Sequence, residues 1–330
     1  MLAKELGISV SSVSKAIRDS HEISSTTKKR VNDLVAKLNY VPNPYASSLR
    51  RRNSKTIGVV IPEVTDSFFA QAINGIESVA VEKGYHVLIY LTHERLEKEK
   101  TILKDFESGR VDGVLMSVSK ETTQCNHINE LMSIGVPLVF FDRVVDEIET
   151  TRITTNDYES AYQATQLLIS KGCKQVLFLS FSNNLSISSK RLDGYKNALA
   201  DQKLKTPKKN IITFNNDPKR DYLSLKRRLG AAKRPEGILA SVEKLAIPVY
   251  QACEELQLSI PGDIQVISFS NLDTASFLNP PLTTISQPAF EMGKMAASVL
   301  MKTLLKKNQG PAPKEIIIPS TLVIRKSTKE

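Results

Sequence analysis

The sequence predicts a small all-α head followed by a large α/β body built on two doubly wound parallel sheets. Two observations lead to this fold class. The first 41 residues contain three short helical patterns, whereas from residue 56 on apolar runs alternate with amphipathic segments. Such alternation is typical of parallel sheets with helices on both faces. At 330 residues the chain is long enough for two or three domains.

Positive charge is concentrated at the start of the chain. Residues 1–55 hold eleven lysines and arginines against four acidic residues, a net charge of +7. The other 275 residues carry thirty-four basic and thirty-one acidic side chains, a net charge of only +3. A basic head on a nearly neutral body indicates a polyanionic partner for the head.

Three helices are expected in the head, residues 1–41. Leu2–Leu6 forms the first, and Gly7 ends it as a C-terminal cap residue would. Ser9 can cap the second, Val10–Ile17, by accepting a hydrogen bond from a first-turn amide. The third begins at Ser24 or Ser25.

The order Ala3, Gly7, Val13 has helix-turn-helix spacing, in which a small residue, a turn glycine and an apolar plug let two helices approach. The exposed side of the second helix then carries short polar groups first and cations later, a pattern that suits a major groove: Val10, Ser11, Ser14, Lys15 and Arg18. The alternative is an ordinary three-helix bundle with a polar surface. The local charge favours DNA binding.

A hinge and linker are expected over residues 42–55. Asn43-Pro44 can begin a short helix, because proline fits the first helical turn. Tyr45–Leu49 is too short to be stable alone in water, and three consecutive arginines, residues 50–52, follow it. The stretch is therefore either a solvated linker or a helix that forms only where phosphate neutralises the arginines.

The body, residues 56–330, alternates between candidate strands and amphipathic helices. The strands are expected at Ile57–Ile61, His86–Tyr90, Gly113–Met116, Leu138–Phe141, Gln175–Leu179, Gly237–Leu239 and Gln265–Phe269. The helical segments include Phe68–Lys83, Glu94–Ser108, Ser160–Lys171 and Val242–Gln257.

Several function classes lack support in the sequence. Three distant cysteines without a CxxC are expected to be reduced core thiols of a cytoplasmic protein, and four scattered histidines have no metal-ligand spacing. We expect no metal, no cofactor, no membrane span and no signal peptide. Neither a GxGxxG after a strand nor a GxxxxGK[ST] occurs, and no nucleophile–base set is apparent, so an enzyme is not expected.

A family resemblance is carried by VSSVSKAI, LNYVPNPYASSLR, IGVVIP, SKRLDGYKNAL, FLNPPLTTISQP and RKST. These motifs resemble the LacI/GalR family of bacterial transcription regulators along the whole chain. The resemblance implies a repressor that binds a pseudo-palindromic operator as a homodimer and responds to a small-molecule effector, in carbohydrate or related metabolism. It also implies a bilobed body like that of periplasmic binding proteins.

The resemblance assigns roles in DNA binding. Bases would be faced by Ser9, Val10, Ser11 and Lys15, and the DNA backbone by Ser14, Ser24, Thr27, Tyr40 and Asn43. Ala46 and Leu49 would belong to the hinge helix, with Leu49 inserted into the minor groove. Three crossings between lobes are implied, near Thr155, Gln287 and Pro313. Lobe one would then be residues 56–155 and 288–312, and lobe two residues 156–287 and 313–326.

The effector would bind between the lobes, and the resemblance places seven residues there: Phe68, Phe69, Asp142, Arg143, Asn156, Arg191 and Ser270. Phe68 and Phe69 are equally consistent with core packing. Two departures bear on the ligand, since relatives usually have Asn-Asp within the segment that is Ser241–Lys244 here, and an Asp where Ser270 stands. Losing these groups while keeping two arginines predicts an anionic effector, such as a sugar acid or sugar phosphate. The alternatives are a cleft that has lost its ligand, with the arginines neutralised by Asp142 or Glu243, and a protein co-effector that acts on the lobe surfaces.

Two other function classes are weighed against a regulator. A solute-binding protein of a transporter would share the body fold but would have no use for residues 1–55. An enzyme fused to a DNA-binding head would need a catalytic constellation that the sequence does not suggest.

Overall fold

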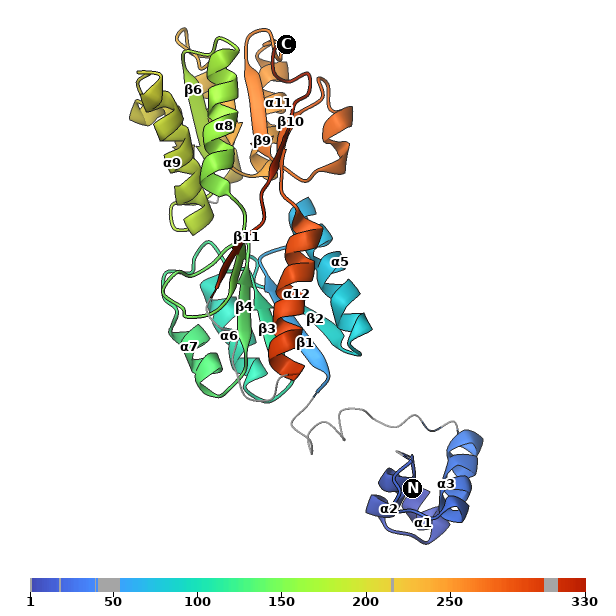
Figure 1. The fold of residues 1–330 in the computed structure, drawn as a ribbon. Coiled ribbons are helices and arrows are strands. Elements are labelled where there is room, and N and C mark those ends of the chain that lie inside the picture. Colours follow the sequence, from blue (N-terminus) through green and yellow to red (C-terminus); the bar gives the residue numbers. More distant parts are fainter. Residues whose placement is uncertain (1, 18, 39, 41–53, 215–216, 306–313) are drawn as a thin grey trace. The chain divides into compact units, whose positions relative to one another are not determined.

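The computed structural model describes residues 2–17, 19–38, 40, 54–214, 217–305 and 314–330. The chain divides into two compact units, Met1–Arg52 and Asn53–Glu330 (Figure 1). We call the first unit the head and the second the body. The predicted hinge falls mainly on residues 41–53, which lie outside the described residues.

The head consists of α1 (Leu2–Leu6), α2 (Val10–Ile17) and α3 (Ser25–Lys37) around a small apolar core. Gly7 has a φ of +65°, a left-handed conformation that favours glycine and turns the chain from α1 into α2. Ser9 Oγ accepts from Ser12 N at 3.0 Å, and Ser24 Oγ accepts from Thr27 N at 3.3 Å, so each serine caps its helix. The predicted turn glycine and both caps are thereby confirmed.

Lobe one of the body has a six-stranded sheet in the order β11-β5-β4-β3-β1-β2 with all described pairs parallel. Its strands are β1 (Thr56–Ile61), β2 (His86–Leu91), β3 (Gly113–Met116), β4 (Leu138–Phe141), β5 (Arg152–Thr154) and β11 (Glu315–Ile317). Its helices are α5 (Ser67–Glu82), α6 (Leu96–Phe106), α7 (Asn126–Ser133) and α12 (Ala289–Leu305). Side chains alternate across the sheet: Val59 packs with α5 and α12, and Val60 packs with α6 and α7.

Lobe two repeats this architecture with the strand order β12-β10-β9-β8-β6-β7, in which only β12 is antiparallel to its neighbour. Its strands are β6 (Val176–Ser180), β7 (Ile211–Thr213), β8 (Gly237–Ala240), β9 (Gln265–Phe269), β10 (Thr283–Ser286) and β12 (Thr321–Val323). Its helices are α8 (Asp157–Ser170), α9 (Ser186–Asp201), α10 (Pro218–Leu229) and α11 (Ala246–Glu255). Three 3₁₀ helices also occur, η1 (Lys208–Asn210), η2 (Glu243–Leu245) and η3 (Asp273–Phe277).

The chain crosses between the lobes three times, but the third crossing is not where the sequence placed it. The first two lie between β5 and α8 and between β10 and α12. The expectation that the chain enters lobe two near Pro313 is wrong, because Glu315–Ile317 pairs with β5 at the edge of lobe one. The third crossing therefore lies between Ile317 and Thr321.

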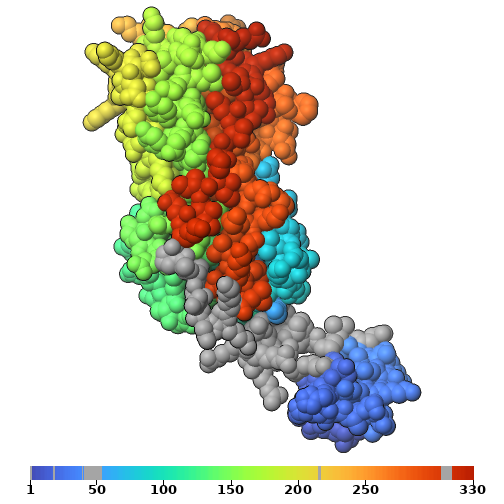
Figure 2. Space-filling view, in the orientation of Figure 1, coloured from blue at the N-terminus to red at the C-terminus, as the bar shows by residue number. Residues whose placement is uncertain are grey.

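The helices α5 and α12 run side by side on one face of lobe one, as Figures 1 and 2 show, and a glycine on each helix allows their close approach. A Cβ on Gly75 would lie 2.0 Å from the backbone oxygen of Phe290, and a Cβ on Gly293 would lie 2.0 Å from that of Ala72. Neither contact is compatible with a side chain unless the helices separate. Apolar side chains of both helices pack with Ile57, Val59 and Ile61 of β1.

Candidate DNA-binding helix and interlobe cleft

The face of α2 that the sequence assigned to DNA is exposed. Val10 keeps 76% of its surface accessible, and Ser9, Ser11 and Lys15 are also exposed, while Val13 and Ala16 are buried in the head core. An exposed valine beside short hydroxyls gives contacts for thymine methyl groups and base edges. The arrangement therefore presents one side of α2 outward and uses the other for packing.

Other predicted DNA contacts lie around α3. Ser24 is exposed, Thr27 and Ser14 are partly exposed, and Tyr40 is 44% exposed. Lys15 pairs with Glu22, and Lys28 pairs with Asp19 at 2.6 Å, so two cations of the head are held by acidic neighbours. The remaining predicted DNA contacts, Arg18, Asn43, Ala46 and Leu49, lie outside the described residues.

A cleft between the two lobes is lined by residues from the carboxyl ends of strands on both sides, the edge at which open α/β sheets bind ligands. Its lining residues are Asp66, Phe68, Phe69, Asp142, Arg143, Ile187, Arg191, Val242, Glu243, Phe269, Ser270, Asn271 and Gln287. Six of the seven predicted effector residues are among them. The seventh, Asn156, lies before α8, where its Oδ1 accepts from Ser160 Oγ at 3.1 Å and from Ser320 N at 2.7 Å.

The cleft is closed. Its cavity volume is about 20 Å³, which is room for a single water molecule. Ligand pockets in proteins commonly have volumes of about 300–1,000 Å³. The lobes would have to separate before a sugar-sized molecule could enter.

Phe68 and Phe69 serve both of the roles that the sequence left open. They are 5% and 1% exposed and belong to the core of lobe one, where their rings meet edge to face at 5.3 Å. They also line the cleft. The core therefore fixes the aromatic wall of the site.

Each arginine of the cleft is paired with a carboxylate. Arg143 Nη1 donates to both oxygens of Glu94, at 2.9 and 3.0 Å, and its Nε lies 3.7 Å from Asp142 Oδ2. Burial acts to raise the pKa of Glu94, but the charge and hydrogen bonds of Arg143 outweigh it and hold that pKa below its usual value. The charge count behind the anionic effector thus needs correction, because Arg143 is not a free guanidinium.

Arg191 is likewise paired within lobe two. Its Nε donates to Asp157 Oδ1 at 2.7 Å, its Nη1 donates to the backbone oxygen of Ser241, and its guanidinium lies 3.8 Å from the ring centroid of Phe269. The side chain is 1% exposed. Arg191 anchors the floor of the cleft instead of pointing a free fork at a ligand.

Acidic groups of the cleft are held in an unfavourable environment for charge. Burial raises the pKa of Asp142 from 3.8 to about 6, although Arg143 and Arg191 oppose this. The backbone at Asp142 has a φ of +61°, which directs the chain sharply out of β4. Burial, and then the nearby charge of Glu243, also raise the pKa of Asp66.

Phe181, directly after β6, was missed by the sequence analysis. Its ring is contacted by three cations, with Lys244 Nζ at 3.9 Å, Lys120 Nζ at 4.7 Å and the Arg143 guanidinium at 5.3 Å from the centroid. Lys120 and Arg143 belong to lobe one, so these contacts bridge the lobes. The sequence did contain a signal for Phe181, because this residue follows a buried strand, as Asp66 and Asp142 do.

Glu243 was also missed as a site residue, although its segment was noted as a departure. Its Oε1 accepts from Ser67 N at 2.9 Å, across the gap, and its Oε2 accepts from Asn271 N at 3.2 Å within its own lobe. A residue of lobe two therefore bonds to the first turn of α5 in lobe one.

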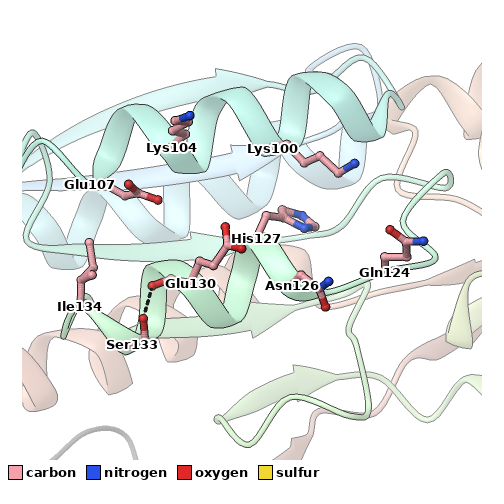
Figure 3. A pocket seen from close by; sticks show the side chains of 9 residues that line it. All are labelled: Lys100, Lys104, Glu107, Gln124, Asn126, His127, Glu130, Ser133 and Ile134. Atoms are coloured by element: carbon pink, nitrogen blue, oxygen red, sulfur yellow. Dashed lines mark hydrogen bonds between the residues drawn. The ribbon is translucent and has the colours of Figure 1, made fainter.

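A second, open groove lies between α6 and α7, away from the cleft (Figure 3). Its lining mixes cations, carboxylates and amides: Lys100, Lys104, Glu107, Gln124, Asn126, His127, Glu130, Ser133 and Ile134. His127 Nε2 of α7 lies 2.9 Å from Oε1 of the buried Glu99 of α6, so this pair links the two helices. Glu99 also accepts a hydrogen bond from Ser119 N. The described ranges contain no cluster of three potential metal ligands and no helix long and apolar enough to cross a membrane.

Comparison with known proteins identifies both parts of the chain. Residues 2–43 match the bacterial regulatory proteins of the lacI family, and residues 165–328 match the periplasmic binding protein-like domain. The ribose operon repressor of Haemophilus influenzae is 29% identical over 326 residues, covering 99% of this chain and 97% of that protein.

Two solved structures share the fold of the body. A LacI family transcriptional regulator from Enterococcus faecium with bound ribose has a TM-score of 0.71 and 26% identity, covering 83% of this chain and 98% of that one. A periplasmic binding protein/LacI transcriptional regulator from Alkaliphilus metalliredigens complexed with D-xylulofuranose has a TM-score of 0.72 and 27% identity, covering 84% and 100%. Together with the helix-turn-helix head and the two α/β lobes, these matches agree with a regulator and not with an enzyme. The chain belongs to the LacI family of DNA-binding transcriptional regulators.

Proposed function

We propose that the protein is a repressor that binds a pseudo-palindromic operator as a homodimer and changes its DNA affinity when a small polar molecule enters the interlobe cleft. The observation that carries the proposal is the combination, in one chain, of an exposed helix-turn-helix face and a bilobed body. The regulated genes would belong to carbohydrate or related metabolism, as the name of the Haemophilus influenzae relative says of that protein.

Base recognition is assigned to the first turns of α2. Val10 and Ser11 are exposed there, and Lys15 follows one turn later. Tyr40, Thr27 and the capping residue Ser24 would contact the DNA backbone. Ala46 and Leu49 would form the hinge helix, with Leu49 as the minor-groove wedge, a role that rests on the family resemblance.

Exposed apolar side chains support a homodimer. On lobe two, Phe277 of η3 is 85% exposed, Leu223 of α10 is 50% exposed and Ile247 of α11 is 46% exposed. On lobe one, Val81 of α5 is 64% exposed and Ile89 of the edge strand β2 is 44% exposed. Large apolar groups exposed on both lobes are what a second copy would cover, and a dimer would present two heads to two half-sites.

Operator selection from a random DNA library, followed by fluorescence anisotropy, tests the proposal. We expect a selected site with two related half-sites and an affinity that falls steeply with salt, because lysines and arginines displace counterions from DNA. Lys15→Ala should weaken binding and relax sequence preference, and Leu49→Ala should weaken binding while leaving the dimer intact. The control, Lys98→Ala, changes the same charge on α6 of the body and should bind like the parent chain. Selection of no site, or equal loss in the control, would refute the assignment.

A further inference from the structure

Glu243 stands out because one side chain of lobe two is held by groups from both lobes. Its Oε1 accepts from Ser67 N of lobe one at 2.9 Å. Its Oε2 accepts from Asn271 N and Ser270 Oγ of lobe two, each at 3.2 Å. Three donors therefore converge on a single carboxylate, and two of them are backbone amides whose position the fold determines.

The donor from lobe one lies at a helix N-terminus. Ser67 is the first residue of the 16-residue α5, where backbone N–H groups have no partner inside the helix and the helix dipole is positive. Such ends bind carboxylate and phosphate groups readily. Asp66 caps the next amide, Phe68 N, at 3.0 Å, so the Ser67 amide remains for the Glu243 carboxylate.

Further contacts close the gap around Glu243. Lys244 Nζ reaches Glu63 Oε1 of lobe one at 2.6 Å. Asn271 Nδ2 donates to Gln71 Oε1 at 2.9 Å, and Gln71 Nε2 donates back to the Asn271 backbone oxygen at 3.2 Å. With the cavity reduced to about 20 Å³, the cleft is closed around its own side chains.

We propose that Glu243 is a built-in ligand: its carboxylate fills an anion subsite formed by Ser67, Ser270 and Asn271 and holds the lobes together without a bound molecule. An effector that carries a carboxylate would take the place of Glu243 in this subsite. The second statement rests on the proposed function, whereas the first does not. The sequence predicted an anionic effector because of the two arginines. In this proposal the groups that bind the anion are instead Ser67, Ser270 and Asn271.

Glu243 is also placed so that it can be displaced. Asp66 lies beside it at the same helix end, and repulsion between the two carboxylates is one cause of the raised pKa of Asp66. Two residues, Ser241 and Val242, connect the end of β8 to Glu243, which is the first residue of η2. Withdrawal of Glu243 would leave the amides of Ser67 and Asn271 available to a free carboxylate.

Chemical rescue with acetate tests the proposal on the full chain. Glu243→Ala removes the carboxylate and leaves space for acetate, so the melting temperature in sodium chloride should fall. Sodium acetate at equal ionic strength should restore it saturably, whereas acetamide, which is similar in shape but uncharged, should not. The matched control is Glu255→Ala, which removes an exposed carboxylate paired with Lys226 at 2.5 Å, and acetate should leave it unchanged.

Hydrogen exchange at Ser67 and Asn271 gives the local readout. Both amides should exchange on the order of tenfold faster in Glu243→Ala and should regain protection in acetate, because hydrogen bonds to charged groups are stronger than neutral ones. If Glu243→Ala does not fold, Glu243→Gln replaces it, and the same amides should lose part of their protection. Unchanged exchange in a folded variant, or an acetate effect equal in variant, parent and control, would overturn the proposal.

Operator binding separates the two statements. If acetate restores amide protection and also changes the operator affinity of Glu243→Ala, both the subsite and its regulatory use are supported. Restored protection with an unchanged affinity would support the built-in ligand and refute its coupling to DNA. Failure of the parent chain to bind any operator would refute the proposed function. The hydrogen-exchange result would still show whether Glu243 occupies the anion subsite.

Discussion

Asp142→Asn should stabilise the body at neutral pH. Asp142 follows β4, is 6% exposed, and has a pKa raised by burial from 3.8 to about 6. The opposing charge of Arg143 is already included in that value. Asparagine resembles the protonated acid and tolerates the left-handed backbone, φ +61°, that Asp142 adopts. The substitution therefore removes the cost of a buried charge without straining the chain.

The size and pH dependence of the effect follow from linkage. A carboxyl whose pKa is higher in the folded state binds protons more tightly in that state. The folded protein therefore loses stability as the pH rises from 3.8, the usual pKa, to about 6, the pKa in the folded state. A rise of this size corresponds to about 3 kcal/mol. Variant and parent should therefore be equally stable near pH 4, and the variant should gain up to about 3 kcal/mol above pH 6.

Urea unfolding followed by circular dichroism at several pH values measures this difference. Asp146→Asn is the control, because Asp146 lies in the same loop but its side chain is 61% exposed beside Arg152. We expect no pH-dependent difference between this control and the parent. An Asp142→Asn variant that is less stable than the parent at pH 7 would show that the interaction of the Asp142 carboxylate with Arg143 outweighs the cost of burying its charge, contrary to the reasoning.

Three further predictions concern packing and the head. Gly75→Ala should lower the free energy of unfolding by roughly 2 kcal/mol in urea, because its Cβ would meet the Phe290 backbone oxygen; unchanged stability would contradict the close contact. Ser24→Ala removes the cap of α3 and should destabilise the head by about 1 kcal/mol in thermal unfolding, with a Thr substitution retaining most of the stability. Glu22→Gln should tighten operator binding in anisotropy, because it releases Lys15 and removes a negative charge that repels DNA; weaker binding would mean that Glu22 positions Lys15 for its bases.

Much of the fold could be predicted because its signals are local. In the head, Gly7 indicates the end of the first helix and Ser9 indicates the start of the second. In the body, long apolar runs indicate the central strands. The strands β5 and β11 were not predicted, since each has only three residues; β11 is the edge strand and pairs with β5, which also pairs with β4. The misplaced third crossing has the same cause.

The cleft residues were found where strands end, but their partners were not. Glu94 lies 49 residues before Arg143, and Asp157 lies 34 residues before Arg191, so neither ion pair has a sequence signature. The bond from Glu243 to Ser67 spans 176 residues and exists only because the lobes close. The family resemblance and the ends of strands therefore placed residues in the cleft, but neither predicted that Arg143 pairs with Glu94 or that Arg191 pairs with Asp157.

The late return of the chain to lobe one has a consequence for synthesis on the ribosome. The strands β1 to β5 emerge early, but α12, which covers the apolar face of this sheet beside α5, begins only at Ala289. Lobe two is also completed last, since the fully buried Ser327 donates to Val266 O at 2.6 Å and accepts from Thr283 N at 2.7 Å. Each lobe is thus completed by residues that follow most of the other lobe in the sequence, so two incomplete apolar cores are exposed together during much of synthesis.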